Sequence, residues 1–98
     1  MPRYVVLVNY THEGITNVKG ALDRLEANRK AFEDMGVRIV DFYWTMGQYD
    51  MVAVMEAPDD ETAEAAAMAY GTRGTGRSLT MRAFSPQEMS AILDKVPG

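Results

Sequence analysis

The sequence predicts an α+β fold, a ferredoxin-like βαββαβ sandwich in which helices cover one face of an antiparallel sheet. Three observations lead to this prediction. Four short stretches are rich in β-branched and aromatic residues, two longer stretches repeat apolar residues at helical spacing, and only a few residues separate the middle two short stretches. The resulting order β-α-β-β-α-β is that of the ferredoxin-like fold, and a short C-terminal helix is expected after it.

The first part of the chain is expected to hold one strand and one long helix. The strand spans residues 4–10, a run of β-branched and aromatic side chains. The helix begins near Ile15 and ends at Gly36, because glycine suits a C-terminal cap. Its apolar residues recur at three-, four- or seven-residue spacing and should face the core; they are Ile15, Val18, Leu22, Leu25 and Phe32.

A β-hairpin should follow this helix. Its strands are expected over residues 37–45 and 49–57, with Gly47 in the link between them. Pro58 ends the second strand, because proline cannot donate a hydrogen bond to the ladder. The middle of the chain therefore supplies two antiparallel strands.

The remaining elements have clear end signals. Asp59 is a good N-cap for a second helix, and Gly71 closes that helix. A fourth strand is expected over residues 78–84. Ser85 and Glu88 then form a capping box around a proline at the first helical position, so a short helix should follow. We expect that helix to turn its apolar residues inward; they are Met89, Ile92, Leu93 and Val96.

Length and composition indicate an ordinary globular protein. At 98 residues the chain has room for one core, so residues 1–98 are expected to form a single domain. Ten Lys and Arg residues against 14 Asp and Glu residues give a net charge of -4, which argues against nucleic acid or an anionic membrane as a partner. The absence of cysteine excludes disulfides and thiolate metal sites. We expect a cytoplasmic protein without a targeting signal, metal site or cofactor.

The predicted strands present two different faces. One alternating set carries no charge and should face the helices; it consists of Tyr4, Val6, Val8, Tyr10, Val40, Phe42, Trp44, Met51, Ala53, Met55, Leu79, Met81 and Ala83. The opposite set mixes charged residues with large apolar ones, namely Val5, Leu7, Ile39, Val52, Val54 and Phe84. These are too many apolar side chains to leave against water. We therefore expect the mixed face to pair with a second copy of the chain or to meet a ligand.

Short motifs along the chain resemble the GYD domain family. The clearest is Gly47-Gln48-Tyr49-Asp50, a Gly-x-Tyr-Asp step of the kind that gives the family its name. Others are Leu7-Val8-Asn9-Tyr10-Thr11 before Gly14-Ile15, Arg24-Leu25-Glu26-Ala27, Glu56-Ala57-Pro58-Asp59-Asp60 and Arg82-Ala83-Phe84. The family is similar to the dimeric α/β-barrel group, so the resemblance implies that two ferredoxin-like protomers pair their sheets around a central space. It implies no established activity, because the wider group mixes cofactor-free monooxygenases, haem-degrading enzymes, lactone isomerases and stress-responsive proteins.

Two residues are candidates for catalysis. His12 is the only histidine and lies in the turn after the first strand. It would serve as a general base, a proton shuttle or an axial haem ligand, or it is simply an exposed loop residue. Asp50 follows the hairpin link, where it either accepts backbone hydrogen bonds that shape the turn or acts as a base on the mixed face.

Four further residues are candidates for ligand binding: Asn9, Tyr43, Tyr49 and Arg82. Arg82 either recognises an anionic ligand or forms an ion pair with a carboxylate of the mixed face, which carries Asp41, Asp50 and Glu56. The glycine-rich residues 71–78 leave a helix and enter a strand, the reverse of the order in a phosphate loop, so we interpret them as a plain connection.

Two functions from different classes follow from these residues. The first is a homo-oligomeric small-molecule-binding or stress-associated protein, with a cavity for an apolar or aromatic ligand between the paired sheets. The second is a cofactor-independent monooxygenase or isomerase acting on an aromatic or lactone-like substrate, with Asp50 or His12 as the base. The first is favoured, because no pair of base and nucleophile emerges from the sequence.

Overall fold

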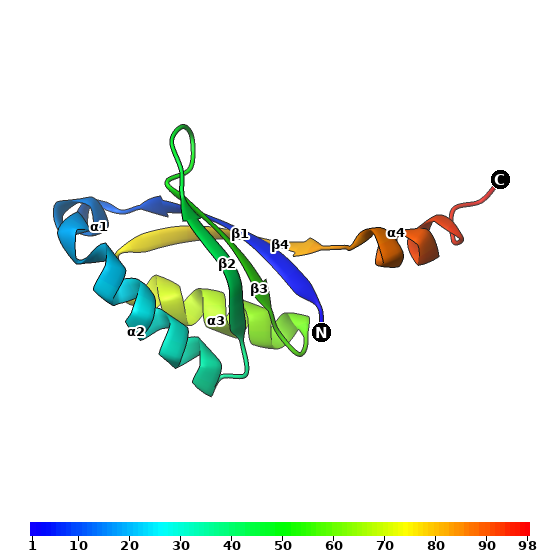
Figure 1. Ribbon diagram of the computed structural model, residues 1–98, viewed down its shortest axis with the longest axis horizontal. Coiled ribbons are helices and arrows are strands. Elements are labelled where there is room, and N and C mark those ends of the chain that lie inside the picture. The colour runs from blue at the N-terminus through cyan, green and yellow to red at the C-terminus, as the bar shows by residue number, and fades with distance from the viewer.

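A computed structural model describes all 98 residues and shows a four-stranded antiparallel sheet in the order β2-β3-β1-β4 (Figure 1). The strands are β1 (Arg3–Tyr10), β2 (Arg38–Trp44), β3 (Met51–Glu56) and β4 (Gly76–Ala83). The ferredoxin-like α+β prediction is confirmed, because strand order and element order both match that fold.

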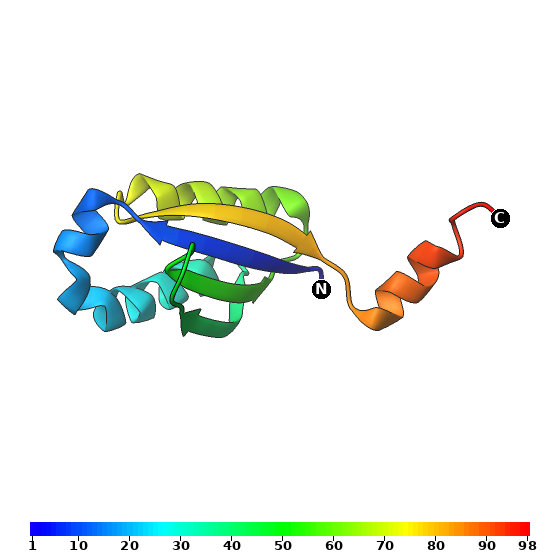
Figure 2. The ribbon, with the colours of Figure 1, turned by 90° about the horizontal axis from the view of Figure 1, so that it is seen from above.

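The two main helices lie on one face of the sheet (Figures 1 and 2). α2 (Ala21–Asp34) packs against β2, and α3 (Asp60–Thr72) packs against β4. A short helix α1 (His12–Thr16) and a 3₁₀ turn (Val18–Gly20) connect β1 to α2, and α4 (Pro86–Leu93) follows β4. No helix has both the length and the apolar character that a membrane crossing would require.

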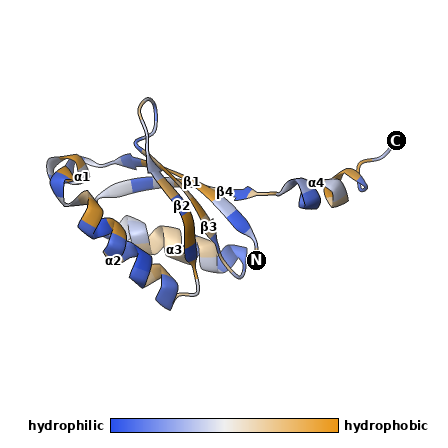
Figure 3. Ribbon diagram, in the orientation of Figure 1, coloured by the Kyte–Doolittle hydropathy of each residue, from blue (hydrophilic) through white to orange (hydrophobic).

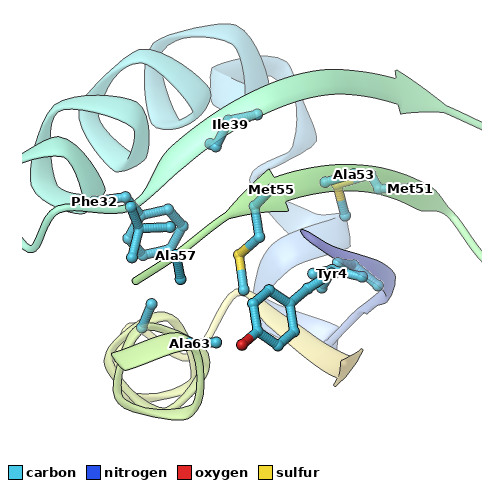
Figure 4. Packing of buried hydrophobic residues seen from close by; sticks show 12 residues of the cluster. Tyr4, Phe32, Ile39, Met51, Ala53, Met55, Ala57 and Ala63 are labelled. Carbon is cyan, nitrogen blue, oxygen red and sulfur yellow. The ribbon is translucent and has the colours of Figure 1, made fainter. Parts of the chain in front are cut away.

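The core lies between the sheet and these helices (Figure 4). Tyr4, Val6 and Val8 of β1 point inward, as do Met51, Ala53 and Met55 of β3. Ala63 and Ala66 of α3 are almost completely buried, and such small side chains let the helix approach the sheet closely. The opposite face of the sheet carries no helix.

The alternation predicted for β4 is wrong by one residue. Val6 pairs with Thr80 and Leu7 pairs with Leu79, so Thr80 lies on the helix side and Leu79 on the uncovered side. Gly76 explains this register. A Cβ atom at Gly76 would lie 2.1 Å from the Tyr70 hydroxyl of α3, so the residue without a side chain has to face the helix. Because side chains alternate along a strand, every second residue of β4 after Gly76 then faces the helices as well.

The prediction for Ile39 is wrong for a related reason. Ile39 pairs with Met55, whereas Asp41 pairs with Val54, so the strand is irregular between Ile39 and Asp41. An extra residue of this kind shifts the side-chain alternation along the strand. Ile39 consequently belongs to the core and is 7% exposed.

The predicted long helix is broken into α1 and α2. α1 lies against the connection that enters β4, where the Thr11 hydroxyl donates to the Gly74 carbonyl at 2.5 Å and a Cβ atom at Gly14 would meet the Thr75 carbonyl oxygen at 1.9 Å. This contact holds α1 in its own position, so α1 does not continue into α2. Ile15 and Leu22, which were predicted to face the core, are more than half exposed.

The C-terminal helix also differs from the prediction. Its capping box is present, with the Ser85 and Glu88 side chains bonded to each other's backbone amides. Its apolar residues do not turn inward, because none of its residues is buried. α4 instead projects away from the sheet and from both main helices (Figure 2).

Tyr4 ties the first strand to the second main helix. Its ring is 3% exposed, and its hydroxyl donates to Asp60 Oδ1 at 2.5 Å, next to the first turn of α3. Burial and the hydrogen bond to Asp60 raise the pKa of Tyr4 to about 12. The neutral phenol is therefore part of the folded state.

We predict that Tyr4→Phe lowers the free energy of unfolding by about 1 to 2 kcal/mol at pH 7, because a hydrogen bond to a carboxylate is lost while exposed Asp60 regains water. The raised pKa also gives a pH dependence. The contribution of Tyr4 is complete below pH 10.0, where the unfolded phenol begins to ionise, and is lost as the pH rises through about 12. Urea unfolding at pH 7 and pH 11 measures both effects. An identical alkaline loss of stability in the two chains would contradict this assignment.

Candidate functional site

The sheet face opposite the helices is a continuous apolar surface, which we call the uncovered face. Across its central strands Val5 pairs with Val54 and Leu7 pairs with Val52. The β4 residues Leu79 and Met81 continue the surface on one side, and Tyr43 of β2 continues it on the other. Tyr43, Leu79 and Met81 are 60%, 45% and 41% exposed.

Most charged and polar residues of the uncovered face lie at its two ends, and exposed Asp41 of β2, which pairs with Val54, is the exception. At one end Glu56 contacts Arg3 at 3.7 Å and forms a hydrogen-bonded ion pair with Arg38. The hydrogen bond from Arg38, with the charges of Arg38 and Arg3, lowers the pKa of Glu56. At the other end Asn9 pairs with Arg77. An apolar centre with a polar rim is the usual anatomy of a protein-protein interface.

Asp50 holds the β2–β3 hairpin against the end of β1. Its carboxylate accepts a hydrogen bond from the Tyr10 amide at 2.9 Å, and its own amide donates to the Val8 carbonyl at 2.9 Å. Its carbonyl accepts from the Thr45 amide at 2.8 Å, which closes the hairpin. The turn interpretation of Asp50 thus has direct structural support. Gly47 has a φ of +105°, the positive value expected for the link.

No hydrogen bond or ion pair joins the other candidates near this end to one another. His12 is exposed as the first residue of α1, and its imidazole makes no hydrogen bond or ion pair that would orient it. Tyr49 contributes its backbone carbonyl, which accepts from the Thr45 hydroxyl at 2.6 Å. Asn9 and Tyr43 lie on the uncovered face, as predicted. A base without a second positioned group is a weak basis for chemistry.

Arg82 lies elsewhere. It pairs with Tyr4 and therefore projects on the helix side of the sheet, so the prediction that it shares a face with Asp41, Asp50 and Glu56 is wrong. Its guanidinium contacts Glu88 at 3.2 Å and lies 4.5 Å from the centre of the Phe84 ring. Tyr10 lies six residue steps along β1 from Tyr4, so Arg82 lies roughly 20 Å from the Asp50 end of the sheet.

The structure contains a small, partly open pocket that the sequence did not reveal. It has a volume of about 80 Å³ and lies between the helix side of the sheet and the helices α2 and α3. Its lining is mostly apolar, with Tyr70 and Thr80 among the polar members, and the buried Thr80 hydroxyl has no hydrogen-bond partner in the protein. Pockets for drug-sized ligands measure about 300 to 1,000 Å³. This pocket is therefore smaller than a site for a drug-sized ligand.

A sequence signal for this pocket does exist in hindsight. Ala66 and Ala67 follow each other on the sheet side of α3, and both line the pocket. Small side chains there leave space that the strands do not fill. No three His, Asp or Glu side chains gather in a way that would hold a metal ion.

Comparison with known proteins agrees with this architecture. The model of the GYD domain family matches residues 4–93. A protein of Thermus thermophilus named "Glutamine synthetase and cystathionine beta-lyase binding protein" is 33% identical over 94 residues, which cover 95% of this chain and 99% of that protein. A crystal structure of a protein from Thermus thermophilus has a similar fold, with a TM-score of 0.55, 22% identity, and coverage of 87% of this chain and 95% of the other. The chain belongs to the GYD domain family.

Proposed function

We propose that this chain is a protein-binding module without turnover, which pairs with a second copy through the uncovered face and in that form binds metabolic enzymes. One observation carries the proposal. The apolar residues of the uncovered face, among them Leu79 and Met81, form one block across adjacent strands that nothing in the chain covers. Contiguous apolar surface of this kind marks an interaction site.

The size of the molecular surface supports association. The chain exposes 6624 Å², whereas a compact monomer of 10.9 kDa would expose about 5,600 Å². The excess is about 1,000 Å², close to the roughly 800 Å² that each partner buries in a standard interface. The radius of gyration is 14.9 Å, against about 12.6 Å for a compact chain of this length. The chain therefore exposes enough surface, beyond that of a compact monomer, to form one interface of standard size.

The relative supplies the class of partner. It is named for binding glutamine synthetase and cystathionine beta-lyase, and it matches this chain over almost its whole length. We extend that property to this chain and take the glutamine synthetase of its own host as the first enzyme to test. The proposal keeps the cytoplasmic expectation, because a chain without cysteine needs no oxidising compartment.

The chemistry of the remaining candidates favours binding over turnover. Asp50 is engaged by backbone amides, His12 has no orienting partner, and Arg82 lies on the other side of the sheet. The pocket of about 80 Å³ on the helix side is smaller than the engineered cavity of ~150 Å³ that admits benzene, and it is not the space between paired sheets that was expected to hold a ligand. Our proposal is limited to protein partners, because the similar protein is named for binding enzymes.

Leu79→Glu tests the pairing. We predict that it raises the dimer dissociation constant at least about 100-fold, because a carboxylate would be desolvated within the interface. Leu22→Glu on α2 is the matched control, since Leu22 is 69% exposed on the helix side and the charge change is the same. Sedimentation equilibrium measures both constants. A wild-type chain that stays monomeric near 100 μM, or equal effects of the two variants, would refute the pairing.

Binding to the host's glutamine synthetase is a separate prediction. Isothermal titration calorimetry should show saturable binding by the wild-type chain and by Leu22→Glu. Leu79→Glu should bind at least about tenfold more weakly, because the proposal makes the paired form the binding species. If neither the host's glutamine synthetase nor its cystathionine beta-lyase binds the wild-type chain, the assignment of enzyme partners is wrong.

Asp50→Asn separates a structural role from a chemical one. The amide oxygen can still accept from the Tyr10 amide but carries no charge, so the free energy of unfolding should fall by about 1 kcal/mol. Affinity for the enzyme partner should stay within about twofold, because Asp50 lies at the edge of the uncovered face. Thermal unfolding and calorimetry provide the two measurements. Unchanged stability together with lost binding would show that Asp50 contacts the partner.

A further inference from the structure

The segment from Phe84 to Val96, which contains α4, forms an arm that lies outside the folded body. It leaves the end of β4 and extends away from the sheet and from α2 and α3 in both views (Figures 1 and 2). None of the α4 residues is buried, and α4 makes no extensive packing with another element. The arm therefore contributes little to the core of its own chain.

Local interactions nevertheless define the arm as a helix with a set direction. The Ser85 hydroxyl accepts from the Glu88 amide at 3.1 Å, and Glu88 Oε1 accepts from the Ser85 amide at 3.0 Å. The other Glu88 oxygen accepts from Arg82 at 3.2 Å, which ties the first turn of α4 back to β4. The hydrogen bond from the Ser85 amide, together with that from Arg82, lowers the pKa of Glu88. Glu88 thus both caps the helix and fixes its orientation.

One side of this helix is apolar and has no cover. At 100° per residue, Met89, Ile92 and Leu93 fall on one side of the helix and Gln87 and Ala91 on the other, and Val96 follows in the turn after the helix. Met89, Leu93 and Val96 are 43%, 57% and 60% exposed, and Phe84 before the helix is 52% exposed. Figure 3 shows both hydrophilic and hydrophobic colour along α4. An isolated helix of eight residues is marginal in water, so this stripe requires a surface to pack on.

The surface that fits is on a second copy of the chain. The bridge between Arg82 and Glu88 holds the first turn of α4 at the end of β4, and from there α4 extends away from its own sheet. The apolar residues Leu79 and Met81 of the uncovered face lie on β4, the strand that continues directly into Phe84 and the arm. A partner seated on the uncovered face would therefore extend toward the arm. The surface excess of about 1,000 Å² includes the arm and matches one interface of standard size.

We propose that α4 packs its apolar stripe on the second copy, so that the two chains of a pair exchange their arms. This inference rests on the pairing in the proposed function and adds a second contact to it. In a twofold pair each arm makes the same contact, because the interface is self-complementary. The folded body needs no change to allow this, since the arm is already extended.

Photo-crosslinking on the full-length chain tests this directly. Benzoylphenylalanine replaces Leu93 on the apolar side in one protein and Ala91 on the opposite side in the other. We expect covalent dimers at twice the chain mass, at least about fivefold more from position 93, with mass spectrometry locating the crosslink between two chains. Crosslinks from position 93 within one chain, or to no protein, would overturn the proposal. So would equal yields from both positions.

A pair of double variants separates this proposal from the pairing itself. Met89→Glu with Leu93→Glu should raise the dimer dissociation constant at least about tenfold, because two charges would enter the contact. Gln87→Glu with Ala91→Glu adds the same charge on the other side of α4 and should leave the constant within about twofold. If Leu79→Glu weakens the dimer while both double variants match wild type, the arm proposal fails and the sheet pairing stands. If the wild-type chain is monomeric, both fail together.

Discussion

The sheet of this protein has two apolar faces, and the chain has helices for only one of them. α2 and α3 cover the side that holds Tyr4, Val6 and Met55, and these three side chains are buried. On the other side Val5, Leu7, Val52 and Val54 lie against Leu79, Met81 and Tyr43 with no element above them. Apolar area of this extent is costly to leave in water. The pairing we infer, the enzyme-binding role and the exchange of α4 all follow from this one imbalance.

A few specific contacts decide which side chains appear on the uncovered face. Gly76 has to face α3 because the Tyr70 hydroxyl occupies the space of a Cβ atom, and this contact places Leu79 and Met81 on the uncovered side. Asp50 anchors the hairpin to the end of β1 through the Tyr10 amide. Both contacts join parts of the chain that are distant in sequence, and together they set the composition of the surface that a partner would meet.

The sequence predicted the element types and their order well, because those depend on local signals. The capping box at Ser85, the N-cap at Asp59 and the positive φ of Gly36 and Gly47 are all present. The errors arose where contacts between residues distant in the sequence determine which face a side chain occupies. The one-residue shifts at β4 and near Ile39 depend on pairings across strands, and a shift of one residue moves every side chain to the other face. The displaced Arg82 is a direct result of the β4 shift.

Two other features could not be read from local patterns. The apolar spacing from Ile15 to Leu22 is consistent with a single helix, but docking of α1 at the Thr75 carbonyl breaks it. The stripe on α4 was expected to face the core, because periodicity shows that a helix has an apolar side and does not show what covers it. Both features became clear only from contacts between elements. In both cases the apolar side chains that no element of the chain covers point outward, where a partner has access to them.

The most direct test of the central claim is methionine oxidation followed by mass spectrometry on the unmodified chain. Met81 lies on the uncovered face and is 41% exposed in the single chain, whereas Met68 lies on the outer side of α3 and is 67% exposed. If the uncovered face pairs with a second copy, Met81 should oxidise at least about tenfold more slowly than Met68 at high protein concentration, and dilution should remove the protection. Comparable oxidation of Met81 and Met68 at every concentration would show that this face is open to water and would contradict the account.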